Sequence, residues 1–288
     1  MSKILACIDA SPYGASVCDH AAWAASLLDA EVDLLHVLDR APDAPPTDVS
    51  GSIGLGASEH LLEQLTQLDA DRGRLRMERG RALLAEAERR VRDAGVSGVE
   101  VRLRHGGLVD TLHEIESEFR LVVLGKRGEH VDFAKAHLGG SVEQVVRASA
   151  LPVLMATRAF KPVKRIVLAF DGGPSARKAV DFLVSEPRLR AFDCHVVTAG
   201  HPRDAEIHLA WLTERLSAWG GAHTVRQIDG EPEAVITDYV AANDIDLLVM
   251  GAYGHSPIRR FIVGSTTTAM IRICLLYTSD AADDLLCV

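Results

Sequence analysis

The sequence predicts an α/β fold built from two tandem doubly wound domains, each with a five-stranded parallel sheet. Short apolar runs alternate with helix-like segments along the chain, and this alternation is typical of parallel strands joined by right-handed crossovers. The same order of segments occurs twice, which indicates a duplication. The chain has 288 residues, of which 48% are hydrophobic, and that is enough for two packed cores.

Two pairs of matching segments carry the evidence for duplication. An apolar run near the N-terminus ends in Asp9, and a similar run in the second half ends in Asp171. Later in each half, another apolar run leads into a Gly-x-x-Gly pattern, at residues 121–128 and 247–254. Because both pairs follow the same order, we infer that one folding unit is present twice.

These matches divide the chain into parts. We predict one domain over residues 1–158 (copy one) and a second over residues 163–274 (copy two), joined by a linker that contains Pro162. Residues 275–288 are rich in Asp and Ala and lack a strand pattern over most of their length. We interpret them as a non-native tail from a frameshift or a cloning artefact, and we expect the last strand of copy two to be altered.

Each expected strand is a short apolar run between polar residues, as in a strand that is covered on both faces. In copy one these runs are residues 4–8, 32–38, 99–103, 121–124 and 151–155. In copy two they are residues 166–170, 194–198, 225–228 and 246–250.

Helices are expected between these strands. In copy one they are residues 15–28, 59–94, 109–119 and 141–149, and in copy two residues 174–184, 205–219, 234–242 and 267–273. Ser11 and Pro12 are typical of an N-cap followed by the first residue of a helix. The long segment 59–94 is rich in Leu, Arg and Glu, and we expect a break near Gly73 or Gly80.

Composition excludes several classes of function. The net charge is −9, and an acidic chain without a basic stripe is a poor match for nucleic acid or an anionic membrane surface. No apolar run reaches the roughly 18 residues that a membrane span needs. The N-terminus enters a strand-like run with no basic segment before it, so we expect no signal peptide and a cytoplasmic location.

Motifs for metal binding and catalysis are not predicted. The five cysteines form no C-x-x-C pair, and His36, His105 and His113 fall on separate expected elements. Asp110 and Glu114 share a helix face that is typical of solvated carboxylates. The sequence contains no Walker loop, no G-x-S-x-G elbow and no G-x-G-x-x-G after the first strand. We therefore predict no catalytic residue and no resident metal site.

The glycine-rich segment of copy two predicts phosphate binding. Gly251 and Gly254 are followed, after nine residues, by Gly264 and Ser265 at the expected start of a helix. Glycines let backbone N–H groups approach a phosphate, and a helix N-terminus adds free N–H groups and a partial positive charge. Further donors or positive charges come from the side chains of His255, Arg259, Arg260 and Thr266.

These residues resemble the universal stress protein family, whose members carry Gly-x-x-Gly, nine residues, then Gly and Ser or Thr. The resemblance covers residues 3 to about 274, as in a tandem member. It implies an adenine nucleotide alpha hydrolase-like fold and ATP, with or without Mg²⁺, as the ligand. It places the adenosine near Asp171, Thr198 and Ala199. The phosphates are expected on Gly251, Gly254, His255, Arg260, Gly264, Ser265 and Thr266.

Copy one departs from this pattern. Ten residues separate Gly128 from Gly139, and the position that should carry a hydroxyl is Gly140. Taking Gly140 and Ser141 as the pair makes the gap eleven residues. Glu129 directly after the loop would also repel phosphate. We interpret copy one as a degenerate partner that keeps the fold and the interface.

Three functions remain open at this point. The first is a stress-response protein that binds ATP through copy two, with a regulatory or protective role and at most slow hydrolysis. The second is a ligand-free structural pseudo-dimer. The third is an adenine-nucleotide enzyme of a related superfamily, although neither Asp9 nor Asp171 is followed by the motif that such enzymes need. We expect an intramolecular pseudo-dimer with a homodimer as a further possibility, and the sequence identifies no protein partner.

Overall fold

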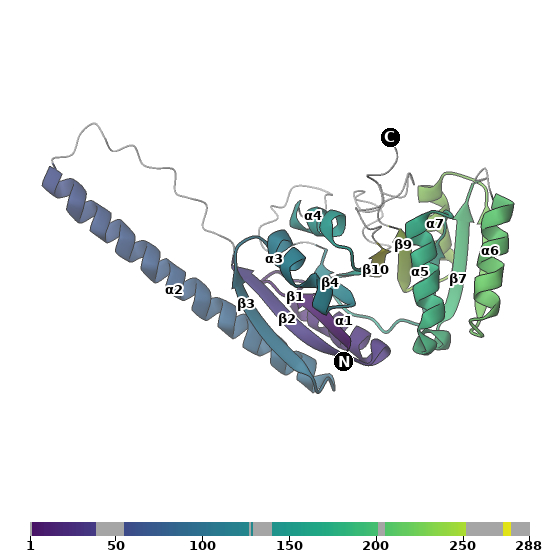
Figure 1. The fold of residues 1–288 in the computed structure, drawn as a ribbon, viewed down its shortest axis with the longest axis horizontal. Coiled ribbons are helices and arrows are strands. Elements are labelled where there is room, and N and C mark those ends of the chain that lie inside the picture. Colours follow the sequence, from purple (N-terminus) through teal and green to yellow (C-terminus); the bar gives the residue numbers. More distant parts are fainter. Residues whose placement is uncertain are drawn as a thin grey trace.

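The computed structural model describes residues 2–38, 55–126, 128, 140–200, 205–251 and 273–277. Within them, one continuous sheet of ten strands runs through both halves of the molecule, in the order β3-β2-β1-β4-β5-β10-β9-β6-β7-β8 (Figure 1). The predicted α/β fold is therefore confirmed, with helices on both faces of each half.

Copy one contributes five parallel strands. They are β1 (Ser2–Cys7), β2 (Ala30–Leu38), β3 (Val99–His105), β4 (Leu121–Gly125) and β5 (Val153–Ala156). The helices are α1 (Gly14–Leu28), α2 (Leu55–Asp93), α3 (Leu108–Ile115), the short 3-10 helix η1 (Glu116–Glu118) and α4 (Gly140–Ala148). Each lies within a few residues of the element that the apolar periodicity predicts.

The second half repeats the arrangement, again with parallel pairs. Its strands are β6 (Arg165–Ala169), β7 (Asp193–Ala199), β8 (His223–Ile228), β9 (Leu247–Gly251) and β10 (Ile273–Tyr277). Its helices are α5 (Pro174–Ser185), the 3-10 helix η2 (Pro187–Ala191), α6 (Ala205–Ser217) and α7 (Pro232–Ala242). The predicted helix at residues 267–273 lies outside the described residues except for Ile273, which begins β10.

The two five-stranded sheets meet where β5 and β10 pair antiparallel, with Leu154 opposite Leu275. We call this pair of strands the seam. β10 occupies the place of the last strand of copy two in the sheet. Three residues of the segment 275–288 therefore lie in the sheet, and the rest of that segment lies outside the described residues.

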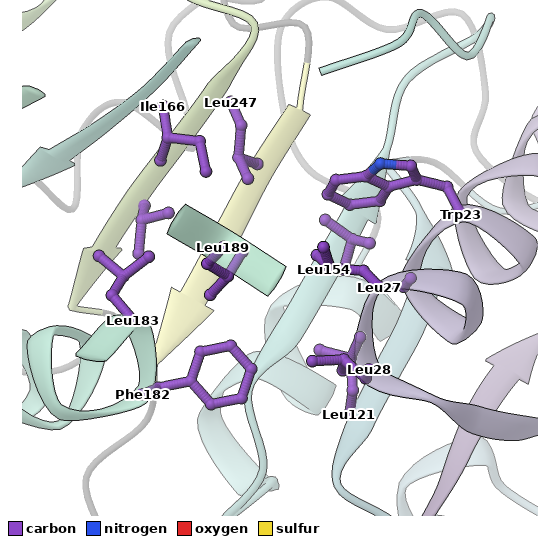
Figure 2. A pocket seen from close by; sticks show the side chains of 12 residues that line it. Trp23, Leu27, Leu28, Leu121, Leu154, Ile166, Phe182, Leu183, Leu189 and Leu247 are labelled. Atoms are coloured by element: carbon purple, nitrogen blue, oxygen red, sulfur yellow. The ribbon is translucent and has the colours of Figure 1, made fainter. Parts of the chain in front are cut away.

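A shared core also joins the copies. Apolar side chains beneath α1 and α2 form one buried cluster with those beneath α5 and α6, from Ile4 and Leu34 to Leu168 and Trp219. Figure 2 shows where the two sets face each other across a small apolar cavity of about 30 Å³. Trp23, Leu27 and Leu28 line it from α1, and Phe182, Leu183 and Leu189 from α5 and η2. The expected intramolecular pseudo-dimer is thus present in the structure.

The first helix has the predicted extent to within one residue, but its N-cap is not the predicted one. α1 starts at Gly14, with Tyr13 as its N-cap, so Ser11 and Pro12 precede it. The Ser11 hydroxyl accepts a hydrogen bond from the Tyr13 N–H at 3.2 Å, and its carbonyl accepts one from Gly14 at 3.1 Å. Serine makes such local turns as readily as helix caps, so Ser11 followed by Pro12 does not by itself define a helix start.

The predicted break in the long helix was wrong. α2 is continuous from Leu55 to Asp93, through Gly73 and Gly80. A glycine costs a helix only about 1 kcal/mol relative to alanine, which neighbouring residues can offset. Gly80 also serves packing, because a Cβ there would lie 2.9 Å from His36 Cδ2 and 3.0 Å from Leu103 Cδ1. The helix approaches the sheet at that point because glycine has no side chain.

Candidate functional site

The two aspartates that end the first strand of each copy lie at equivalent points. Asp9 follows β1 and Asp171 follows β6, and each of these strands lies at the centre of its five-stranded sheet. Strand order reverses between β1 and β4, and between β6 and β9, which is where open α/β sheets bind ligands. Since Gly125 ends β4 and Gly251 ends β9, each aspartate and the first glycine of its Gly-x-x-Gly pattern flank one reversal point.

Each aspartate is fixed by the backbone that follows it. Asp9 Oδ1 accepts a hydrogen bond from the Ser11 N–H at 3.1 Å, and Asp171 Oδ1 accepts one from the Gly173 N–H at 2.9 Å. These bonds hold each carboxylate at the turn that leads into α1 or α5. Both copies therefore share the same local turn at the strand end.

Glycines allow the close approach of neighbouring elements at this edge. A Cβ at Gly251 would lie 2.3 Å from the Ser175 Oγ and 3.4 Å from the Ala176 nitrogen, so β9 ends directly against the first turn of α5. In copy one, a Cβ at Gly128 would lie 3.2 Å from the Asp9 Oδ2. The structure thus brings the loop glycine of copy one to its aspartate, as the pattern predicts.

A histidine that the motif search did not identify packs beside Asp171. Gly172 has a φ of +77°, and a Cβ there would lie 2.0 Å from the Nδ1 of His208 on α6. This nitrogen is buried and has no hydrogen-bond partner among the described residues. The Gly-Gly pair after Asp171 indicates a turn in the sequence, but nothing in the pattern indicates which side chain covers it.

Aromatic and cationic groups extend this contact along α6. Trp211 stacks on Phe170, with ring centroids 6.0 Å apart and an interplanar angle of 5°. The Arg177 guanidinium lies 4.8 Å from the centroid of the Trp211 ring, and its Nε donates a hydrogen bond to the Gly172 carbonyl at 2.9 Å. These contacts fix the turn after Asp171 from two sides.

The end of β7 carries a second unpartnered polar group. Thr198 is 4% exposed, and its Oγ1 has no hydrogen-bond partner among the described residues. Ala199 follows it, half-buried, at the end of the strand. A buried hydroxyl without a partner costs free energy, commonly about 1–3 kcal/mol.

The equivalent position in copy one is occupied differently. Cys7 and Ala169 each stand two residues before the aspartate of their copy. Cys7 pairs with Leu35, and Ala169 pairs with Val197. The next residues along these partner strands, His36 and Thr198, are therefore at equivalent positions. The Nδ1 of His36 lies 2.7 Å from the Ile8 carbonyl oxygen, within hydrogen-bond distance. In copy one, the polar side chain at this position is therefore within hydrogen-bond distance of a carbonyl oxygen of the protein. In copy two, the hydroxyl at this position has no hydrogen-bond partner among the described residues.

The structure describes four of the ten predicted site residues. Asp171, Thr198, Ala199 and Gly251 lie at one sheet edge, as described above. The remaining predicted residues lie outside the described residues: Gly254, His255, Arg260, Gly264, Ser265 and Thr266. The phosphate half of the site therefore remains a prediction.

The described residues offer no alternative metal or thiol chemistry. In this part of the chain, no group of three or more His, Cys, Asp or Glu side chains is arranged to hold a metal ion. Burial raises the pKa of Cys7, Cys18 and Cys194 to about 12 each, so these thiols stay protonated and unreactive at neutral pH. Among the same described residues, no helix has the length and apolar character to cross a membrane.

Comparison with known proteins agrees with this architecture. The model of the universal stress protein family matches residues 1–157 and 199–274. The chain belongs to the universal stress protein family. It is 36% identical over 277 residues to universal stress protein Slr1230 of Synechocystis sp., covering 94% of this chain and 96% of that relative. Over 227 residues it is 25% identical to universal stress protein Rv1996 of Mycobacterium tuberculosis, covering 68% of each chain.

Two solved structures share the fold of this chain over nearly its whole length. A universal stress protein from Archaeoglobus fulgidus superposes with a TM-score of 0.68 over 97% of both chains, at 18% identity. Protein PA1789 from Pseudomonas aeruginosa, described as functionally unknown, superposes with a TM-score of 0.58 over 97% of this chain and 93% of its own, at 16% identity. This chain is similar to both structures in fold.

Proposed function

We propose that this universal stress protein binds ATP through copy two and acts in the cytoplasm as a regulatory or protective protein rather than as a catalyst. The observation that carries the proposal is the asymmetry between Thr198 and His36. At equivalent positions beside the reversal point, copy one satisfies its polar group internally, and copy two buries a hydroxyl without a partner among the described residues. A ligand at that edge would supply the missing hydrogen bond.

The residues of copy two suit a nucleoside. Asp171, Thr198 and Ala199 would contact the adenosine, and the unpartnered Nδ1 of His208 supplies one more polar atom beside Asp171. A carboxylate, a hydroxyl and a ring nitrogen at one sheet edge match the donors and acceptors of ribose and adenine.

The glycine loop would hold the phosphates. Gly251, Gly254 and Gly264 would allow backbone N–H groups to approach, and Ser265 and Thr266 would donate through their hydroxyls. His255 and Arg260 would offset the negative charge of ATP, with or without Mg²⁺. Bound ATP would supply a transferable phosphoryl group.

Copy one has a different role in this proposal. Residues 1–158 form a domain with a degenerate loop, and residues 163–274 form the binding domain. His36 occupies the position of the open hydroxyl and hydrogen-bonds within the protein. Copy one would therefore support the fold and the interface, and bind nucleotide more weakly than copy two.

The test is a Thr198→Val substitution, which keeps the shape and removes the hydroxyl. Because the free protein would lose an unpartnered buried group, its melting temperature without nucleotide should stay equal or rise. Because the complex would lose a hydrogen bond, the ATP dissociation constant should rise about five- to tenfold. Calorimetric titration and thermal unfolding on the same samples measure both.

Thr213→Val is the matched control, because Thr213 is exposed on α6 and bonds to its own helix. It should leave the ATP affinity unchanged. Equal affinities for the wild type and Thr198→Val would contradict the assigned role of Thr198. No heat of ATP binding by the wild type would favour the ligand-free pseudo-dimer instead.

A further inference from the structure

The first half of α2 projects away from the body of the protein. At 39 residues and about 1.5 Å per residue, the helix is about 58 Å long, whereas α6 at the equivalent place in copy two has 13 residues. From Gly80 onward, α2 packs on the sheet through Leu84, Ala87 and Val91. Before Gly80 the helix stands clear of the other described elements (Figure 1).

Leucines are exposed on this projection. Leu65, Leu68 and Leu75 are 44%, 52% and 64% exposed. Five large hydrophobic side chains are exposed among the described residues, and these leucines are three of them. Their spacing of three and seven residues places them in one stripe along the helix. An isolated helix gains most of its stability from packing such a stripe, so the stripe indicates a partner.

The charges on the projection indicate what that partner is. Residues 63–71 contain three acidic side chains, Glu63, Asp69 and Asp71, and no Lys or Arg. Residues 72–81 contain one acidic side chain, Glu78, and five arginines: Arg72, Arg74, Arg76, Arg79 and Arg81. The sign of the charge therefore reverses between Asp71 and Arg72.

A helix with one acidic and one basic half is complementary to itself in the antiparallel direction. In a second copy of the helix that runs the opposite way, the basic half would lie beside the acidic half of the first copy, and the acidic half would lie beside the basic half of the first copy. A twofold axis between Asp71 and Arg72 would also bring Leu68 of one chain opposite Leu75 of the other. A parallel pair would place like charges together along the whole contact.

Asp69, Asp71 and Arg72 make only exposed contacts within the helix. Arg72 lies 3.6 Å from Asp69 one turn away, but both side chains are more than 70% exposed, so the pair contributes little. Gln67 donates to Asp71 within the same exposed surface. Both contacts are of a kind that a second helix can replace.

We propose that the projecting half of α2, residues 63–79, is a homodimerisation element that pairs antiparallel with the same segment of a second copy of this chain. The leucine stripe supplies the apolar contact. The reversal of charge sets the direction. This inference is independent of nucleotide binding.

The first experiment measures mass in solution by light scattering on the full chain. The wild type should have twice the mass of the 31.1 kDa chain at micromolar concentration, and it should dissociate as salt screens the charges. Leu68→Glu combined with Leu75→Glu should give a monomer. Ile207→Glu, at an exposed hydrophobic position on α6, is the matched control and should remain a dimer. A monomeric wild type, or a dimer that survives the double leucine variant, would overturn the proposal.

Reversing the charges on one half of the helix distinguishes loss of the proposed pairing from loss of folding. One variant carries Glu63→Lys, Asp69→Lys and Asp71→Lys, and the other carries Arg72→Glu, Arg74→Glu and Arg76→Glu. Each should be monomeric alone, and a mixture of the two should form a heterodimer, with unchanged helical circular dichroism throughout. No association in the mixture would overturn the role of the charges.

Disulfide formation between introduced cysteines tests whether the two helices are antiparallel. When Leu68→Cys and Leu75→Cys chains are mixed and oxidised, peptide mapping should find the bond between positions 68 and 75. In an antiparallel pair, two positions 68 lie about 10 Å apart along the axis at about 1.5 Å per residue, too far for a disulfide. A predominant bond between two positions 68 would overturn the antiparallel arrangement.

Discussion

His208 packs directly on Gly172, with its Nδ1 2.0 Å from the point that a Cβ of residue 172 would occupy. Gly172 has a φ of +77° and follows the aspartate that would contact the nucleoside. The contact joins α6 to the turn that holds Asp171. The shape of the turn after Asp171 therefore depends on a side chain that is far from it in the sequence.

Replacing Gly172 by Ala should destabilise the protein through both strain and collision. A left-handed backbone costs a non-glycine residue about 1–2 kcal/mol, and the new methyl group would also displace His208. Gly220→Ala is the matched control, because Gly220 has a φ of +72° and nothing lies within 4 Å of its added Cβ. Urea unfolding should show a larger loss of free energy for Gly172→Ala than for Gly220→Ala. Equal losses would mean that His208 moves aside at no cost.

His20 should make the stability of the protein depend on pH. It is fully buried on α1, its Nδ1 lies 2.7 Å from the Ser16 carbonyl oxygen, and burial lowers its pKa. The unfolded chain therefore takes up a proton near the ordinary pKa of about 6.5, where the folded chain stays neutral. The free energy of unfolding should fall as pH drops below that value, by at most about 1.4 kcal/mol per pH unit.

The His20→Leu variant isolates this contribution. Unfolding free energies of the wild type and the variant, measured between pH 7.5 and 5, should differ in slope, with the steeper acid-side loss in the wild type. Parallel curves would show that His20 titrates alike in the folded and unfolded chains.

Both copies should unfold together, because the seam and the shared core connect them. Leu154 is 1% exposed at the seam, and Leu154→Ala should cost about 2–5 kcal/mol. Calorimetry should show a single transition that shifts as a whole in the variant. Two separate transitions, with only one shifted, would mean that the copies fold independently.

Truncation should distinguish β10 from the residues after it. A stop after Ser279 removes only residues outside the described structure and should change the melting temperature by a few degrees at most. A stop after Arg272 removes β10, which pairs with β5 and β9, and should lower the melting temperature strongly. Similar effects of the two truncations would contradict the structural role of β10.

Most of the fold followed from the sequence, because hydrophobic periodicity and duplication are local patterns. The strands of copy one and the strands β6 to β9 of copy two lie where those patterns predict, whereas β10 was not predicted. The N-cap of α1 was predicted wrongly, because Ser11 suits a turn as well as a cap. The continuity of α2 through Gly73 and Gly80 was not predicted, and no local pattern encodes the close packing of Gly80 on His36.

Only part of the candidate site could be predicted from the sequence. The strand-end aspartates and glycines were predictable because topology places them at one edge of the sheet. His208 was not, since its role depends on how α6 lies across Gly172. The difference between Thr198 and His36 likewise requires the register of β1 with β2 and of β6 with β7, which the sequence alone leaves open.

The most direct test of ATP binding by copy two is a calorimetric titration of the full chain and of two matched variants. The wild type should bind one tight ATP per chain. Gly264→Asp should place a carboxylate against the phosphates and weaken binding more than tenfold, about 1.4 kcal/mol or more, whereas Gly139→Asp should have a smaller effect. Equal loss in both variants, or no tight binding by the wild type, would contradict the assignment of the site to copy two.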